Sequence, residues 1–255
     1  MSVLITALLC GAVVGVALGA LGGGGGVLAV PALVYLLGVA PAEAGTTSLV
    51  IVIATSVTAL ARHSGAGSVD WRTGFLFAAA GVLPAVGASA FAHRIPQPAL
   101  TAAFAVLAAL AAAAMLRGAR TARCAPTTEP VGRGGRAGTF AAGAGLGAVT
   151  GLLGVGGGFL AVPALVSVLR LPMRKAVGTS LVVILVNSAV SLATRLTVSG
   201  PNLDPAVFGP FVGAAVLGAW DGKRLAAKLS GTALQRTFAA VLLAVAAAML
   251  IGVLV

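Results

Sequence analysis

Two glycine-rich stretches decide the fold: GGGGGVLAVPALV at residues 22–34 and GVGGGFLAVPALV at residues 154–166. They lie 132 residues apart, and eleven of their thirteen positions are identical. At the same offset, the TSLV of residues 47–50 is repeated at residues 179–182. Self-similarity at one fixed spacing indicates that the chain is built from two copies of one structural unit.

The composition places both units in a membrane. The chain is 59% hydrophobic and 8% charged, whereas soluble domains carry about 25% charged residues. Runs such as residues 2–39 and 237–255 hold no charge and reach the roughly 20 residues that a bilayer core requires. We therefore expect an all-α polytopic protein of the cell inner (plasma) membrane, surrounded by the lipid bilayer. The net charge of +11 fits cytoplasmic loops and lipid headgroups, so no nucleic-acid partner is expected.

Each unit divides into five apolar segments, which predicts about eight to ten helical segments in all. The second segment of each unit has twelve residues and spans only about 18 Å, less than the bilayer core of roughly 30 Å. The first two segments of a unit are therefore either two true spans or a re-entrant hairpin. The expected segments are 2–21, 27–38, 43–62, 73–92, 97–116, 138–153, 159–170, 176–195, 205–222 and 233–254.

Charge distribution predicts the topology. Fourteen of the sixteen Lys and Arg residues fall on one side if each unit crosses the membrane an odd number of times, whereas four crossings per unit divide them equally. Positive charge collects in the cytoplasm, so odd crossings and six or ten spans are favoured. The second repeat is then inverted relative to the first. We expect repeats at 1–117 and 138–255, a cytoplasmic basic linker at 118–137, and both termini outside the cytoplasm.

The glycine runs are the strongest candidates for a binding site. Glycine costs about 1 kcal/mol per residue in a helix interior, so a run of glycines predicts unwound backbone. Unwound backbone at membrane depth is tolerated where it is buried in protein or lines a wet cavity. The short helix after each run would point its free N–H groups at that cavity, which suits an anion. The residues expected to bind substrate here are Gly22, Gly24, Gly25, Gly26, Pro31, Gly154, Gly156, Gly157, Gly158 and Pro163.

Polar residues on the third segment of each unit extend this candidate site. Hydroxyls and an amide can bond an oxyanion without the cost of a buried charge, and the candidates are Thr47, Ser48, Thr179, Ser180 and Asn187. Interhelical hydrogen bonding is the alternative role for these side chains. Ser56 also matches Ser188 at the shared offset of 132.

Other residues receive structural interpretations. Gly11, Gly15 and Gly19 predict close helix packing, and His63 and His93 are expected at the membrane interface because they lie at segment ends. No carboxylate falls clearly in mid-membrane, so we expect no carboxylate relay for protons or sodium. We also expect no metal, no cofactor and no enzymatic activity, and a homo-oligomer is left open.

The motifs resemble those of one known family. A GxGGGxxxVPxL pattern occurs at residues 22–33 and again at 154–165, AxGTSL-like stretches follow at 44–49 and 176–181, and a VDW-type turn occupies 69–71. Together they resemble the TauE/SafE sulfite-exporter family of bacterial permeases over nearly the whole chain. The resemblance implies about eight spans, whereas the charge distribution favours six or ten. It also implies the export of sulfite, organosulfonates or related small anions.

The sequence departs from the family pattern at Val155 in the second glycine run, and at Pro205, which stands where the first copy has Trp71. With Asp204 aligned to Asp70, the family-type contacts at Val155 and around Asp204 are left open. The function expected from the sequence is a membrane permease that exports small sulfur oxyanions. The alternatives are a permease for another small carboxylate or sulfur-containing solute, and a non-transport membrane subunit.

Overall fold

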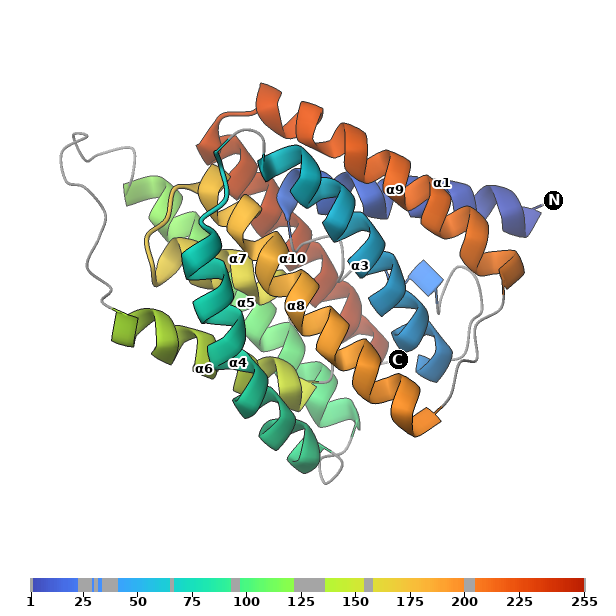
Figure 1. Ribbon diagram of the computed structural model, residues 1–255, viewed down its shortest axis with the longest axis horizontal. Coiled ribbons are helices and arrows are strands. Elements are labelled where there is room, and N and C mark those ends of the chain that lie inside the picture. Colours follow the sequence, from blue (N-terminus) through green and yellow to red (C-terminus); the bar gives the residue numbers. More distant parts are fainter. Residues whose placement is uncertain are drawn as a thin grey trace.

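The computed structural model describes the backbone of most of the chain (Figure 1). The residues outside the description are 1, 23–28, 30–31, 34–40, 65–66, 93–96, 122–135, 154–157, 200–204 and 255. The described part contains nine α-helices, with short turns and loops between some of them, and it contains no strand. The helices are α1 (Ser2–Leu21), α3 (Pro41–Ser64), α4 (Trp71–Ala92), α5 (Gln97–Thr121), α6 (Arg136–Leu153), α7 (Gly158–Ser167), α8 (Met173–Ser199), α9 (Pro205–Lys228) and α10 (Gly231–Leu254).

These helices match nine of the ten predicted segments, and the remaining segment, 27–38, lies mainly outside the described residues. Their ends differ from the predicted ends by six residues or fewer, and the largest difference is at the end of α9. There the helix continues to Lys228 through two turns that contain basic residues. Long basic side chains extend toward the headgroups, so a helix need not end where its apolar stretch ends.

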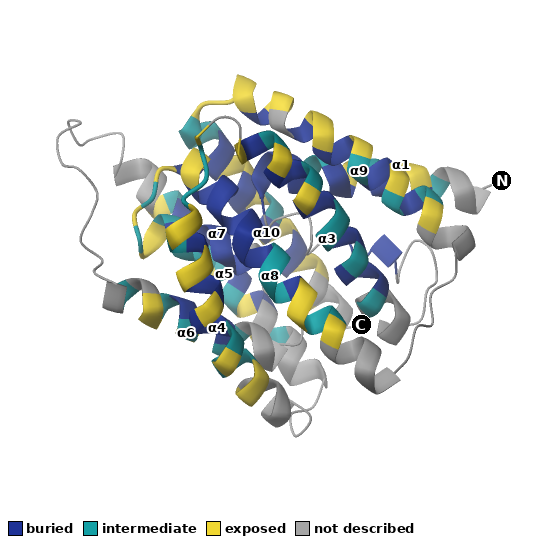
Figure 2. Cartoon of the chain, viewed as in Figure 1, coloured by how far each residue is buried: buried dark blue, intermediate teal, exposed yellow. Residues whose placement is uncertain are grey.

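Several helices have the length and composition of membrane spans. Among the described residues, three stretches are long and apolar enough to cross a bilayer, namely Thr46–Ser64, Met173–Ala193 and Gly231–Ala248. Shorter apolar helices cover Thr6–Leu21, Ala105–Arg117 and Phe140–Val149. Exposed positions lie along the outward faces of the helices (Figure 2), and they include large apolar residues such as Leu83, which is 81% exposed, and Leu217, which is 72% exposed. Such a surface is unfavourable in water and suits lipid.

Helix α1 packs against α9 of the other repeat at very short range. A Cβ atom added to Gly11 would lie 2.5 Å from the Phe211 carbonyl oxygen, and one added to Gly15 or Gly19 would overlap the carbonyl of the residue opposite. The pairs along this seam are Gly11 with Phe211, Gly15 with Ala215 and Gly19 with Ala219. Because both numbers rise together, the two helices run in parallel. The predicted packing role of the three glycines is confirmed.

A second seam joins α6 to α4 in the same way. A Cβ on Gly143 would lie 2.6 Å from the Phe77 carbonyl oxygen, and one on Gly147 would overlap the Gly81 carbonyl. Gly143 and Gly147 are the repeat equivalents of Gly11 and Gly15, 132 residues further on. The first helix of each repeat therefore packs against a helix of the other repeat. The seam between α1 and α9 is equivalent to the seam between α6 and α4.

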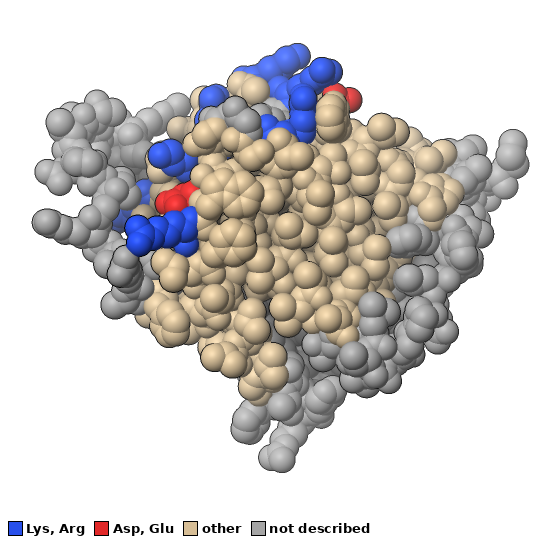
Figure 3. Space-filling model, viewed as in Figure 1, with Lys and Arg blue, Asp and Glu red and all other residues tan. Residues whose placement is uncertain are grey.

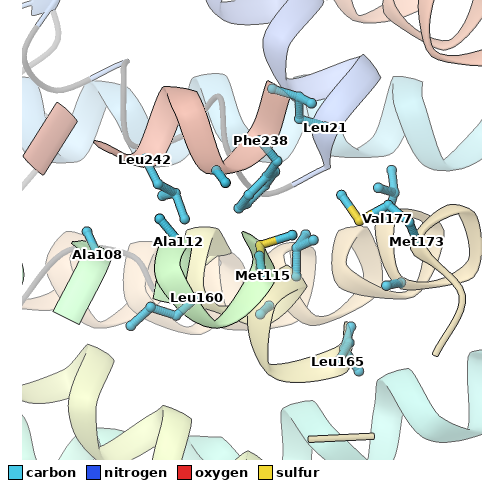
Figure 4. Packing of buried hydrophobic residues seen from close by; sticks show 14 of the residues in the cluster. Leu21, Ala108, Ala112, Met115, Leu160, Leu165, Met173, Val177, Phe238 and Leu242 are labelled. Carbon is cyan, nitrogen blue, oxygen red and sulfur yellow. The ribbon is translucent and has the colours of Figure 1, made fainter. Parts of the chain in front are cut away.

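The remaining helices complete this exchange pattern. Helix α3 contacts its repeat equivalent, α8, and α5 contacts its repeat equivalent, α10. The contact between α3 and α9 is matched by the contact between α8 and α4. In Figure 1, α3 and α8 lie side by side and run in opposite directions. The larger apolar cluster lies between α5, α7, α8 and α10, where Met115, Leu165, Val177 and Phe238 are buried (Figure 4).

One end of the bundle carries the described basic side chains (Figure 3). The start of α8 lies beside the end of α9, because Arg174 Nη2 donates to the Leu229 carbonyl oxygen at 3.3 Å. The start of α10 lies beside the end of α5, because Gln235 Nε2 donates to the Met115 carbonyl oxygen at 2.7 Å. We call this the basic end. Its described basic residues are Arg62, Arg72, Arg117, Arg170, Arg174, Lys175, Arg224, Lys228 and Arg236.

The seams predict a sharp difference between two glycines of α6. Gly147→Ala places a Cβ against the Gly81 carbonyl, whereas at Gly145 an added Cβ meets nothing within 4 Å. We expect Gly147→Ala to lower the stability by about 1–3 kcal/mol through overpacking. Gly145→Ala should leave stability unchanged or raise it by up to about 1 kcal/mol, since alanine favours the helix. Melting temperatures of the two variants in detergent test this, and equal values would contradict the seam.

Candidate functional site

The buried polar side chains gather on the central pair of helices. Among the described residues, nine polar side chains are buried, and eight of them lie on α3 or α8. Buried hydroxyls in a membrane protein are costly unless they are bonded or have a function. The nine are Thr47, Ser48, Thr55, Ser56 and His63 on α3, Thr179, Ser180 and Ser188 on α8, and Gln235 on α10.

These positions are related by the repeat. Thr47 and Thr179, Ser48 and Ser180, and Ser56 and Ser188 are pairs at the offset of 132, and all six side chains are buried. Four of the six were predicted as binding residues. The fold thus brings the hydroxyl candidates of both repeats onto two helices that contact each other.

Thr179 joins the two repeats. Its Oγ1 accepts a hydrogen bond of 3.0 Å from the backbone N–H of Asp70, just before α4. The Asp70 carboxylate in turn caps α4, because it accepts bonds from the backbone N–H and the hydroxyl of Thr73 at 3.1 and 2.7 Å. This is the usual arrangement at a helix N-terminus. Thr179 therefore holds the start of α4 against α8, and this contact was not predicted.

The first glycine of the first run lies against Ser180. Gly22 has φ of +73°, and its N–H donates to the Leu18 carbonyl oxygen at 2.9 Å, so it ends α1 in a left-handed conformation that favours glycine. A Cβ on Gly22 would lie 2.7 Å from Ser180 Oγ, which itself donates to the Val177 carbonyl oxygen at 2.8 Å. A larger residue at position 22 would be strained at this positive φ and would also clash with the Ser180 hydroxyl.

The second glycine run leads into a short helix, as predicted. Helix α7 begins at Gly158, has ten residues and contains Pro163, which is buried. It packs against α8 and α5, so the short helix lies beside the polar helix of its own repeat. The other predicted binding residues of the runs lie outside the described part, namely Gly24, Gly25, Gly26, Pro31, Gly154, Gly156 and Gly157.

Three buried polar atoms near the middle of α3 and α8 have no hydrogen-bond partner within the described structure. They are Ser56 Oγ, Ser188 Oγ and Asn187 Oδ1. Asn187 was a predicted binding residue, whereas the two serines were not. Their match at the offset of 132 was the signal in the sequence that could have found them.

His63 lies near a helix end, and its side chain is buried. It lies in the last turns of α3, near the basic end, but only 6% of its surface is exposed. Its Nδ1 lies 2.9 Å from the Ala59 carbonyl oxygen, so this nitrogen carries the hydrogen and donates. The neighbouring Arg62 covers the Trp220 ring of α9 with its guanidinium carbon 4.4 Å from the ring centroid. His63 therefore lies at a helix end near the basic end, as its sequence position predicts, and its side chain is buried within the protein; its position at the membrane interface stays a prediction, and His93 lies outside the described residues.

Apolar helices with an apolar outer surface define a helical membrane protein, and buried neutral polar groups on two contacting helices are compatible with a transporter. The sequence profile of the sulfite exporter TauE/SafE family matches residues 7–249. The chain belongs to this family of membrane transporters.

Two relatives in Xylella fastidiosa support the assignment. The chain is 37% identical over 247 residues to a "Probable membrane transporter protein" of strain 9a5c. It is 36% identical over 247 residues to a protein of the same description in strain Temecula1 / ATCC 700964. Each alignment covers 95% of this chain and 93% of the relative. No solved structure matches the chain significantly.

The bond between Thr179 and Asp70 predicts a stability effect. Thr179→Val keeps the shape of the side chain but removes the acceptor of the Asp70 N–H. We expect a loss of about 1 kcal/mol or more, because a partly buried donor loses its partner. Thr58→Val is the matched control, since the Thr58 hydroxyl bonds only to the Ala54 carbonyl of its own helix. If thermal unfolding in detergent gave the same melting temperature for both variants, the interhelical role of Thr179 would be excluded.

Proposed function

We propose that the protein exports a small sulfur oxyanion, such as sulfite or an organosulfonate, across the cell inner membrane. The observation that carries this proposal is the set of buried, neutral, repeat-matched hydroxyls on α3 and α8. Neutral donors suit a small anion that must be both bound and released, because each bond is worth only a few kcal/mol at most. The family description, sulfite exporter, supports the choice of sulfur oxyanions.

In this proposal the anion is held without a buried cation. The central turns of α3 and α8 contain no Lys or Arg between Ser48 and Ala61 or between Ala176 and Thr194. The donors are then the hydroxyls of Thr47, Ser48 and Thr179, the Asn187 amide and the backbone N–H groups of the glycine runs. The Ser180 hydroxyl is a donor only if it rotates away from the Val177 carbonyl oxygen, to which it donates in this structure. Helix N-termini and hydroxyls are suitable donors for an oxyanion.

We further propose that the repeats are inverted in the membrane and that transport uses alternating access. The opposite directions of α3 and α8 (Figure 1) and the exchange of α1 and α6 between the repeats support this. Inverted repeats place a binding site near the bilayer midplane, where it can open to either side in turn. The short α7 and its counterpart after the first glycine run would line the site from both repeats.

The basic end is proposed to face the cytoplasm. The linker around Cys124 would then be cytoplasmic, and both chain ends would lie on the opposite side. We expect Cys124, in a Cys10→Ala background, to react with a membrane-impermeant maleimide only after the cells are opened. Strong labelling of intact cells would reverse the orientation.

The glycine runs provide the test of the proposed site. Gly25→Val and Gly157→Val add a side chain where the anion should approach unwound backbone, so each should abolish sulfite flux in proteoliposomes. Gly213→Val on α9 is the matched control, because an added Cβ at Gly213 meets nothing within 4 Å. All three proteins should insert and remain monodisperse on gel filtration. Normal flux in both run variants would mean that the runs only shape the fold.

A further inference from the structure

Two serine hydroxyls stand out among the buried polar groups. Ser56 and Ser188 have no exposed surface, and neither Oγ has a hydrogen-bond partner in the described part of the chain. Each unbonded buried hydroxyl costs about 1–3 kcal/mol. The same cost at two repeat-matched positions calls for a common explanation.

Other hydroxyls on the same helices show that bonding was available. Thr55 Oγ1 donates to the Ile51 carbonyl oxygen at 2.6 Å, Thr58 Oγ1 to that of Ala54 at 2.9 Å, and Ser180 Oγ to that of Val177 at 2.8 Å. Hydroxyls within helices commonly bond a carbonyl one turn earlier in this way. Ser56 and Ser188 do not make such a bond, so their hydrogens are available to another acceptor.

Both serines lie near the middle of their helices. Helix α3 runs from Pro41 to Ser64 and α8 from Met173 to Ser199, so each serine is within about 6 Å of its helix midpoint along the axis. The two helices contact each other and correspond under exchange of the repeats. The serines therefore occupy equivalent mid-helix positions on two contacting helices, and the middle of the spanning segments is the depth where inverted-repeat transporters bind their substrate.

We propose that Ser56 and Ser188 donate hydrogen bonds to the oxygens of one small oxyanion, with the Asn187 amide completing the site. This proposal rests on the proposed function. It adds the hydroxyls of Ser56 and Ser188 to the donors already proposed there. The hydroxyls of Thr179 and Ser180 already take part in bonds within the protein, whereas those of Ser56 and Ser188 do not. Two neutral donors, one from each repeat, suit a ligand that must be bound by both repeats and then released.

The test compares Ser56→Ala and Ser188→Ala with Ser64→Ala in proteoliposomes supplied with sulfite. Ser64 lies on the same helix as Ser56 but is exposed, and its hydroxyl bonds the Ala61 carbonyl oxygen. We expect the apparent KM for sulfite to rise about tenfold in each of the first two variants, as for the loss of one hydrogen bond to a charged ligand. It should stay unchanged in Ser64→Ala, and the double variant should lose saturable flux.

Melting temperature separates a binding role from a structural one. Removing an unbonded buried hydroxyl should leave the melting temperature of the ligand-free protein unchanged or higher. A lower melting temperature with a KM within twofold of the wild type would mean that the hydroxyls bond structural water, and the proposal would be wrong. An unchanged sulfite KM with an altered dependence on sodium would place a cation there instead and would also overturn it.

Direct binding distinguishes this proposal from the proposed function. Sulfite should raise the melting temperature of the purified wild-type protein and should have no such effect on the double variant. If the wild-type protein does not transport sulfite, but sulfite raises its melting temperature and not that of the double variant, the binding site is supported and the proposed export function is wrong. If it transports sulfite with the same KM in every serine variant, the function stands and this site fails.

Discussion

Backbone contact through glycine is the constraint on which the rest of the structure depends. At Gly15 and Gly147 the carbonyl group of the opposing helix occupies the space where any other residue would place its Cβ. Association in a bilayer cannot rely on the hydrophobic effect between helices, so close packing of this kind is a main source of helix affinity. Because the two seams join α1 to α9 and α6 to α4, neither repeat can form its full set of contacts alone.

This interlocking leaves α3 and α8 paired at the centre, and their polar side chains are what the packing encloses. A hydrocarbon environment makes each buried hydroxyl expensive unless it is bonded. Some hydroxyls bond their own helix, as Thr55 does, and Thr179 bonds the backbone ahead of α4. Ser56 and Ser188 differ from these residues because neither Oγ has a hydrogen-bond partner in the described structure, which is why they are proposed to bind a ligand.

Most of the helical architecture could be predicted from sequence because membrane spans are set by apolar length, and because Gly11, Gly15 and Gly19 recur at a spacing that forms one helix face. Helix ends were less predictable, since α9 continues through basic residues to Lys228. The partners of individual hydroxyls could not be predicted at all. Whether Thr179 bonds Asp70, or Ser56 Oγ lacks a hydrogen-bond partner in the described structure, depends on which helices pack together. One sequence shows only that these residues repeat.

In the proposed function, this bundle carries a small sulfur oxyanion between the two sides of a membrane. The most direct measurement is counterflow of radiolabelled sulfite into proteoliposomes that contain the purified wild-type protein and are loaded with unlabelled sulfite. We expect a transient accumulation of label above equilibrium, which requires internal sulfite and is not seen with protein-free liposomes. If sulfite did not accumulate, and sulfate and thiosulfate were equally inactive with monodisperse protein, the proposed function would be wrong.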